Sequence, residues 1–167
     1  MMRDGVLRGE GVSAGMRIGL FGGSFDPPHA GHRHVARTAL RRLGLDQVWW
    51  LVSPQNPLKA TASGDFERRL AAVEAIANEP SMKVSDIETR LGTNRTIDLL
   101  DHLRRRYPAT HFVWLMGADN LAGIHRWANW TAIFETVPVA VISRPQDAVR
   151  ARLSRAARQY AGSRIRE

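Results

Sequence analysis

Short apolar runs alternate with amphipathic stretches along most of this chain. The runs suit buried strands, while the stretches between them repeat apolar residues at spacings of three and four, as helices do. We predict strands at 17–21, 47–52, 82–85, 111–116 and 137–142, and helices at 32–43, 65–78, 96–107, 129–134 and 147–160. Such alternation is typical of an α/β fold, so we expect a doubly wound parallel sheet with helices on both faces.

Local signals mark the ends of two of these helices. Asp65 stands at the start of the helix predicted at 65–78, where an aspartate can cap the first turn. Pro108 follows the helix predicted at 96–107 and cannot continue it. Ligands of parallel sheets bind beyond the carboxyl ends of the strands, so a binding site is expected in the loops that follow the strands.

Length and composition are typical of a single-domain protein. The chain has 167 residues, of which 44% are hydrophobic, enough for one substantial core. Residues 1–15 are rich in glycine and lack a regular pattern. We therefore predict a flexible N-terminal leader over 1–15, followed by one domain over 16–167.

The absence of cysteine excludes a disulfide framework, a thiolate zinc site and a cysteine nucleophile. No apolar run is long enough to cross a membrane, and the N-terminus carries charged residues in place of an apolar signal core. We expect a cytoplasmic protein with no membrane partner.

The charge balance points to an anionic partner. The formal net charge is +8, from 24 basic and 16 acidic residues, and much of the excess lies in the arginine-rich segment 144–167. Nucleotides, nucleic acid and phosphate-rich substrates all fit such a balance. An arginine-rich terminal helix is equally typical of a solvated surface, so charge alone leaves these partners open.

The most informative segment joins the first predicted strand to the first predicted helix. It reads Gly-Ser-Phe-Asp-Pro-Pro-His-Ala-Gly-His over residues 23–32. A helix N-terminus presents unpaired N–H groups and the positive end of a dipole, glycines let a ligand approach the backbone, and histidines donate hydrogen bonds. The segment therefore predicts a phosphate-binding loop, although neither Gly-x-Gly-x-x-Gly nor a P-loop is present.

This loop resembles the signature of the nucleotidylyltransferase superfamily, Gly-x-Phe-x-Pro-x-His-x-Gly-His. Within that superfamily the chain is similar to the bacterial nicotinate-nucleotide adenylyltransferases over about residues 16–145. Further points of likeness follow later strands: Pro-Gln-Asn-Pro-Leu-Lys from Pro54, Arg-Thr-Ile-Asp from Arg95, Gly-Ala-Asp-Asn-Leu from Gly117, His-Arg-Trp from His125 and Ser-Arg-Pro from Ser143.

The resemblance implies a Rossmann-like fold and a reaction of NAD biosynthesis, in which ATP and nicotinate mononucleotide give deamido-NAD and pyrophosphate. It implies Mg²⁺ as the cofactor that accompanies ATP, and His29 and His32 as the catalytic residues. The residues implied to bind ATP are Gly22, Gly23, Ser24, Phe25, Lys59, Gly117 and Asp119. Those implied to bind the mononucleotide are Asn56, Thr96, Trp127 and Arg144, with the Trp127 ring stacked on the pyridine.

Structural roles compete with several of these functional ones. The two histidines could serve only to cap their helix, Asp119 could cap the short helix that follows it, and Lys59 could be a solvated surface lysine. We expect Phe25 to pack beneath its loop, and the remaining tryptophans, Trp49, Trp50, Trp114 and Trp130, to pack in the core or between helices. No protein-bound metal is expected, since His29, His32 and His34 lack an acidic or thiol ligand at matching spacing.

The family has a second signature near its C-terminus, Ile-Ser-x-Thr-x-Ile-Arg, whose hydroxyls and arginine hold the ATP phosphates. This chain reaches Glu167 without it, and residues 162–166 are only superficially similar. We expect a few dozen C-terminal residues of the family pattern to be missing from this sequence.

Three other functions remain open at this point. One is a related nucleotidylyltransferase that uses nicotinamide mononucleotide, phosphopantetheine or CTP, and another is an inactive homologue. The third is a basic nucleic-acid-binding module, although no helix-turn-helix, RNP or zinc-finger pattern is present. The oligomeric state is also left open.

Overall fold

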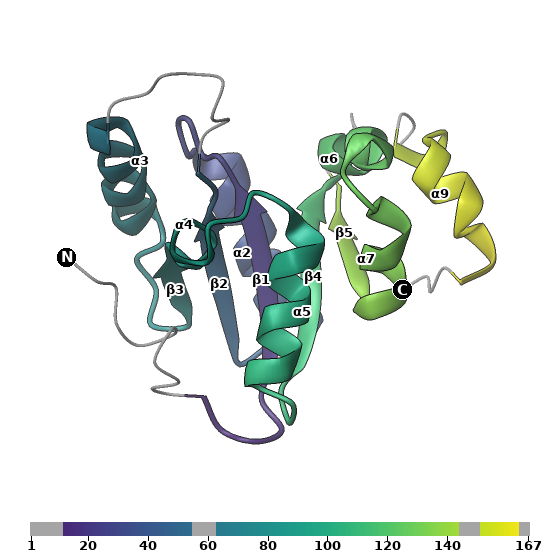
Figure 1. Ribbon diagram of the computed structural model, residues 1–167, viewed down its shortest axis with the longest axis horizontal. Coiled ribbons are helices and arrows are strands. Elements are labelled where there is room, and N and C mark those ends of the chain that lie inside the picture. The colour runs from purple at the N-terminus through teal and green to yellow at the C-terminus, as the bar shows by residue number, and fades with distance from the viewer. Residues whose placement is uncertain (1–11, 55–62, 144–150, 164–167) are drawn as a thin grey trace.

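A parallel five-stranded sheet forms the centre of the protein, as predicted (Figure 1). The computed structural model describes residues 12–54, 63–143 and 151–163. The strands are β1 (Arg17–Gly23), β2 (Gln47–Val52), β3 (Met82–Ser85), β4 (His111–Gly117) and β5 (Val139–Ile142), in the spatial order β3-β2-β1-β4-β5. The chain winds outward from β1 to β3 and then returns to place β4 beside β1, so the winding direction reverses at β1 and β4. This reversal is the expected ligand position of a doubly wound sheet.

Helices cover both faces of the sheet. They are α2 (Ala30–Arg42), α3 (Ser63–Ile76), α4 (Ile87–Leu91), α5 (Thr96–Arg106), α6 (Ala118–Gly123), α7 (Trp130–Thr136) and α9 (Arg155–Gln159), with short 3₁₀ turns η1 (Ile124–Arg126) and η3 (Ala161–Ser163). Apolar residues of α2 and α3 pack in one core cluster, and those of α5 and α7 pack in a second. The α/β fold class is therefore confirmed.

Strand β2 shows how the sequence divides its side chains between these two clusters. Trp49 and Trp50 are adjacent and both fully buried, but Trp49 packs with the α5 cluster and Trp50 with the α2 cluster. Successive residues of a strand point to opposite faces, and a strand covered on both faces is apolar throughout. Trp114 on β4 is also buried, so three of the four tryptophans expected to pack do so in the core. Trp130 is half-buried and packs its ring against Phe134 and Tyr160.

Three predictions about the elements were wrong in detail. Helices α4 and α6 were not predicted, because five- and six-residue helices are too short to show a period. The single helix predicted at 147–160 is interrupted within its described part, since the Ser154 hydroxyl accepts a hydrogen bond from the Ala157 N–H and starts a new helix there. Asp65 does not cap α3, which begins earlier, at Ser63; its carboxylate pairs with Arg68 and Arg69 instead.

The leader predicted at 1–15 is described only from residue 12. Val12 already packs against the core, and the Gly15 N–H donates to the Ala109 carbonyl at 2.8 Å. The structured domain therefore begins a few residues before position 16. Within the described ranges, no helix is both long and apolar enough to span a bilayer.

Candidate active site

The loop between β1 and α2 is anchored by Phe25. This residue has φ +50°, in the left-handed region that residues with side chains rarely adopt, and it is 3% exposed. The ring packs against Phe21, Trp50 and His32, with centroids 5.1 to 5.4 Å away. The predicted packing of Phe25 beneath the loop is therefore confirmed.

His29 and His32 form a reciprocal cap at the N-terminus of α2. The Gly31 N–H donates to His29 Nδ1 at 3.1 Å, and the His29 N–H donates to His32 Nδ1 at 3.0 Å. Each Nδ1 is therefore an acceptor, so the proton of each neutral ring lies on Nε2, which remains as a donor. The rings stack with centroids 3.8 Å apart. Capping and ligand binding are thus compatible roles, because the cap uses one nitrogen of each ring and leaves the other.

His32 is neutral at physiological pH. Burial and, to a smaller extent, the neighbouring His29 lower the pKa of His32 to about 4, while Asp119 acts in the opposite direction. The ring is therefore a hydrogen-bond donor without a charge. The effect of Asp119 also shows that the loop after β4 reaches the histidine pair, as the topology requires.

Gly117 and Asp119 form the β4 side of this site. A Cβ at Gly117 would lie 2.6 Å from Asp119 Oδ1, so the absent side chain makes room for the carboxylate. Gly117 is the N-cap of α6, and no side chain caps that helix. The alternative in which Asp119 caps α6 is therefore wrong, and its carboxylate is exposed near His32.

Gly22, in β1 just before the phosphate loop, has a packing role that its predicted contact with ATP did not suggest. A Cβ there would lie 2.6 Å from Cη2 of Trp114. The Trp114 indole in turn meets the Trp127 ring edge to face, at 6.3 Å between centroids and 86° between planes. Trp127 directly follows η1 and is half-buried. The glycine thus lets Trp114 fill the space beside β1 and support Trp127.

Thr96 begins α5 and is half-buried. An open hollow adjoins it, lined on one side by Arg95, His102 and Arg105. Glu88, on the short helix just before, is 4% exposed, and burial raises its pKa to about 7. The sequence gave no sign that Glu88 is buried, since a glutamate among polar residues is usually solvated.

Of the five remaining predicted site residues, the structure describes two. Gly23 ends β1, and Ser24 follows it as the first loop residue. Lys59, Asn56 and Arg144 lie outside the described residues.

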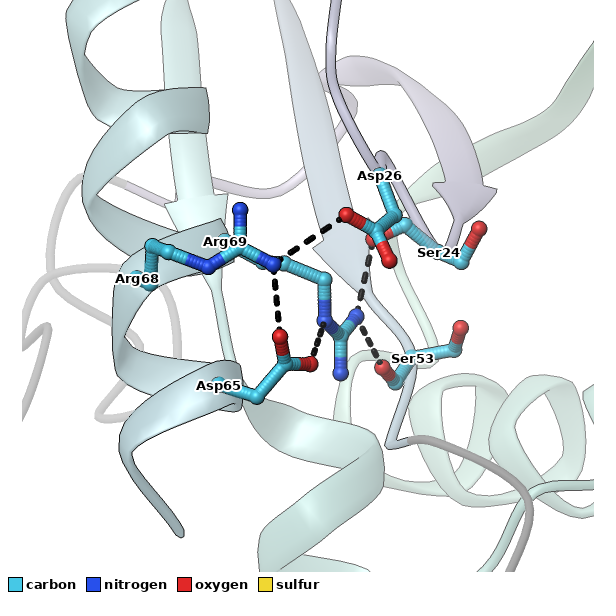
Figure 2. A network of polar contacts seen from close by, with 6 residues as sticks. All are labelled: Ser24, Asp26, Ser53, Asp65, Arg68 and Arg69. Carbon is cyan, nitrogen blue, oxygen red and sulfur yellow. Dashed lines mark hydrogen bonds and ion pairs between the residues drawn. The ribbon is translucent and has the colours of Figure 1, made fainter. Parts of the chain in front are cut away.

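Sequence reasoning missed Arg69 on α3. Its guanidinium is buried and donates to the carbonyls of Ser24 and Ser53 (Figure 2). In the amphipathic pattern of α3 it occupies a polar position between Phe66 and Leu70, and nothing in that spacing separates a buried arginine from a solvated one.

Several known proteins are similar to this chain. The cytidylyltransferase-like family model matches residues 20–167. A protein of Ruegeria pomeroyi named "Probable nicotinate-nucleotide adenylyltransferase" is 59% identical over 151 residues, covering 90% of this chain and 71% of its own. One of the same name from Roseobacter denitrificans is 53% identical over 164 residues, covering 98% and 81%. Among solved structures, Plasmodium falciparum nicotinic acid mononucleotide adenylyltransferase complexed with NaAD shares the fold, with a TM-score of 0.63 and 19% identity over 83% of this chain and 80% of that one.

Proposed function

We infer the function of this chain from its family: it belongs to the cytidylyltransferase-like family, and within it to the nicotinate-nucleotide adenylyltransferases. It transfers the adenylyl group of ATP to nicotinate mononucleotide, which yields deamido-NAD and pyrophosphate. We further propose that the reaction takes place in the cytoplasm, where ATP is abundant.

The reaction depends more on positioning the two substrates than on activating the attacking phosphate. The attacking group is a phosphate monoester with a second pKa of about 6, so it is largely ionised at neutral pH and needs no general base. One of its oxygens forms a bond to the α-phosphorus of ATP while the bond from that phosphorus to the bridging oxygen breaks. The electron pair of that bond leaves with pyrophosphate. The enzyme must hold two anions in line and stabilise the charge that moves to the leaving group.

The observation that carries the proposal is the histidine pair at the N-terminus of α2. The main chain fixes both Nδ1 atoms as acceptors, so each ring offers a donor at Nε2 where the helix dipole also favours an anion. We assign these two donors to the phosphates of ATP. Because His32 is neutral before ATP binds, we assign it a directed hydrogen bond from Nε2 to the phosphates.

The remaining assignments place ATP on the β1 and β4 side. The main chain of Gly22, Gly23, Ser24 and Phe25 would wrap the phosphates, and Gly117 with Asp119 would meet the adenosine, the carboxylate on ribose hydroxyls. Lys59 would reach the triphosphate as a cation. The mononucleotide would lie toward Trp127 and Thr96, with the pyridine stacked on the indole. We add Asn56 and Arg144 to the mononucleotide contacts.

Mg²⁺ is the metal that we propose to accompany ATP. Magnesium binds nucleotide phosphates with one or two carboxylates and several waters, so it needs no cage of protein ligands. In the ranges the structure covers, no three His, Asp or Glu side chains form such a cage, while Asp119 supplies one exposed carboxylate near the histidine pair. Bound to ATP, the metal would neutralise charge on the departing pyrophosphate.

Substrate choice is tested by offering Mg²⁺ and ATP with nicotinate mononucleotide, nicotinamide mononucleotide or phosphopantetheine in parallel reactions. We expect pyrophosphate and deamido-NAD with nicotinate mononucleotide. Turnover only with another acceptor would reassign the substrate, and salt-sensitive DNA binding with no turnover would favour the nucleic-acid alternative.

The role of His32 is tested by replacing it with alanine. The His32→Ala variant should lose about a hundredfold or more in kcat, as enzymes do when a transition-state donor is removed. His34→Ala is the matched control, because His34 is exposed on the same helix turn. Normal turnover by His32→Ala would remove this residue from the mechanism.

A further inference from the structure

Arg69 is a buried charged residue that the reaction itself does not use. It lies on α3, and its side chain is 1% exposed. Its Nη1 donates to the Ser24 carbonyl at 2.8 Å and to the Ser53 carbonyl at 2.9 Å, while its Nε donates to Asp65 Oδ2 at 3.2 Å. Figure 2 shows the guanidinium between the two loops, with Asp65 on its α3 side.

The two carbonyls mark the point where β1 and β2 separate. The last register pair of these strands is Gly23 with Val52, and the Ser53 N–H still donates to the Gly23 carbonyl at 2.9 Å. One step further along each strand, Arg69 bridges the carbonyls of Ser24 and Ser53. The guanidinium therefore extends the strand connection by one residue, into the start of the loop that carries the histidines.

The chemistry of the side chain suits this bridge. A buried cation is costly unless it is paired, and here a carboxylate and two carbonyls satisfy it. Arginine offers donors in a rigid planar fork, so it can hold three partners at fixed separations. Lysine has one nitrogen on a flexible stem and cannot reproduce that spacing.

A second contact reaches the same loop from the surface. Arg68 pairs with Asp65 at 2.6 Å and with Asp26 at 3.3 Å, and its side chain is 61% exposed. An exposed pair of this kind contributes little, because solvent screens it and the side chains lose freedom. Arg68 is therefore a matched control for Arg69, since it lies next to it and contacts the same loop without burial.

We propose that Arg69 is a positioning residue: by bridging Ser24 and Ser53 it sets the separation of the loops after β1 and β2, and so places His29 and His32 against the ATP phosphates. The proposal rests on the proposed function for the identity of the ligand. Arg69 itself is too deeply buried to touch ATP, so its effect passes through the histidine loop.

The test uses the full-length chain as wild type and as the variants Arg69→Lys, Arg69→Met and Arg68→Met, each checked for folding by circular dichroism. Both Arg69 variants should lose about ten- to a hundredfold in kcat, since a displacement of about 1 Å in a catalytic group costs that much. The KM for ATP should change less than kcat, and Arg68→Met should stay within about twofold of wild type in both. If Arg69→Met does not fold, Arg69→Lys decides, because it keeps the charge and a single donor nitrogen in place of the planar fork.

A second measurement needs no turnover. Proton NMR of the His32 ring should give a pKa near 4 in wild type and in Arg68→Met, and a value closer to 6.5 in the folded Arg69 variants, because a displaced loop admits water to the ring. An unchanged His32 titration in a folded Arg69 variant overturns the proposal, whatever its turnover. If wild type makes no dinucleotide, the proposed function fails, while the titration still decides whether Arg69 positions the histidines.

Discussion

Replacing Gly22 with alanine tests how closely the end of β1 is packed against the core. The added Cβ would lie 2.6 Å from Cη2 of Trp114, and Trp114 is only 2% exposed, so its ring has little room to move. Overpacking of this kind costs about 1–3 kcal/mol. Alanine recovers about 0.5–1 kcal/mol, because glycine is unfavourable inside a strand. We expect the Gly22→Ala variant to be about 1–2 kcal/mol less stable than wild type.

Urea unfolding followed by circular dichroism measures this loss as a lower midpoint at unchanged slope. Gly123→Ala is the control for the glycine-to-alanine change itself, since no atom lies within 4 Å of a Cβ at that position. Trp114→Phe removes the ring carbon that clashes, so Gly22→Ala should cost less in that background than in wild type. Additive costs in the double variant, or wild-type stability of Gly22→Ala, would refute the packing argument.

Two further predictions concern the rest of the site. Burial holds the Glu88 pKa near 7 against 4.5 in the unfolded chain, so wild type should lose stability as pH rises from about 4.5 through 7. Glu88→Gln should abolish that dependence and be more stable by about 3 kcal/mol at pH 8 in urea unfolding, and parallel pH curves for the two proteins would contradict the burial argument. Trp127→Ala should raise the KM for nicotinate mononucleotide with little change in kcat, because stacking supports substrate and transition state alike. Steady-state kinetics that leave this KM unchanged would place the pyridine elsewhere.

The histidine loop could be predicted because strand, loop and helix are contiguous in the sequence. The cap that orients His29 and His32 also depends on positions two and three residues apart, so its ingredients are visible locally. The sequence could not show that helix capping and a free Nε2 donor coexist in the same rings. Which nitrogen of each ring accepts the capping hydrogen bond depends on the folded main chain.

Arg69 marks the limit of such reasoning. Its partners Ser24 and Ser53 lie 45 and 16 positions away, and only the folded sheet brings the three together. The packing of Gly22 against Trp114 has the same origin, because β1 and β4 become neighbours only when the chain returns to the centre of the sheet. Helices α4 and α6 were not predicted for a different reason: with five and six residues they span fewer than two helical turns, too few for the apolar spacing to repeat.

The central place of β1 has a consequence for synthesis on the ribosome. β1 pairs with β2 on one side and with β4 on the other, and about sixty residues separate the end of β2 from the start of β4. At about 5–20 residues per second, the ribosome needs roughly 3–12 s to make that stretch. During that interval the nascent chain exposes the β1 edge of the β1–β2 pair, and such an open edge invites pairing with other chains. The emerging polypeptide is therefore most exposed to aggregation and to chaperone capture before β4 leaves the exit tunnel.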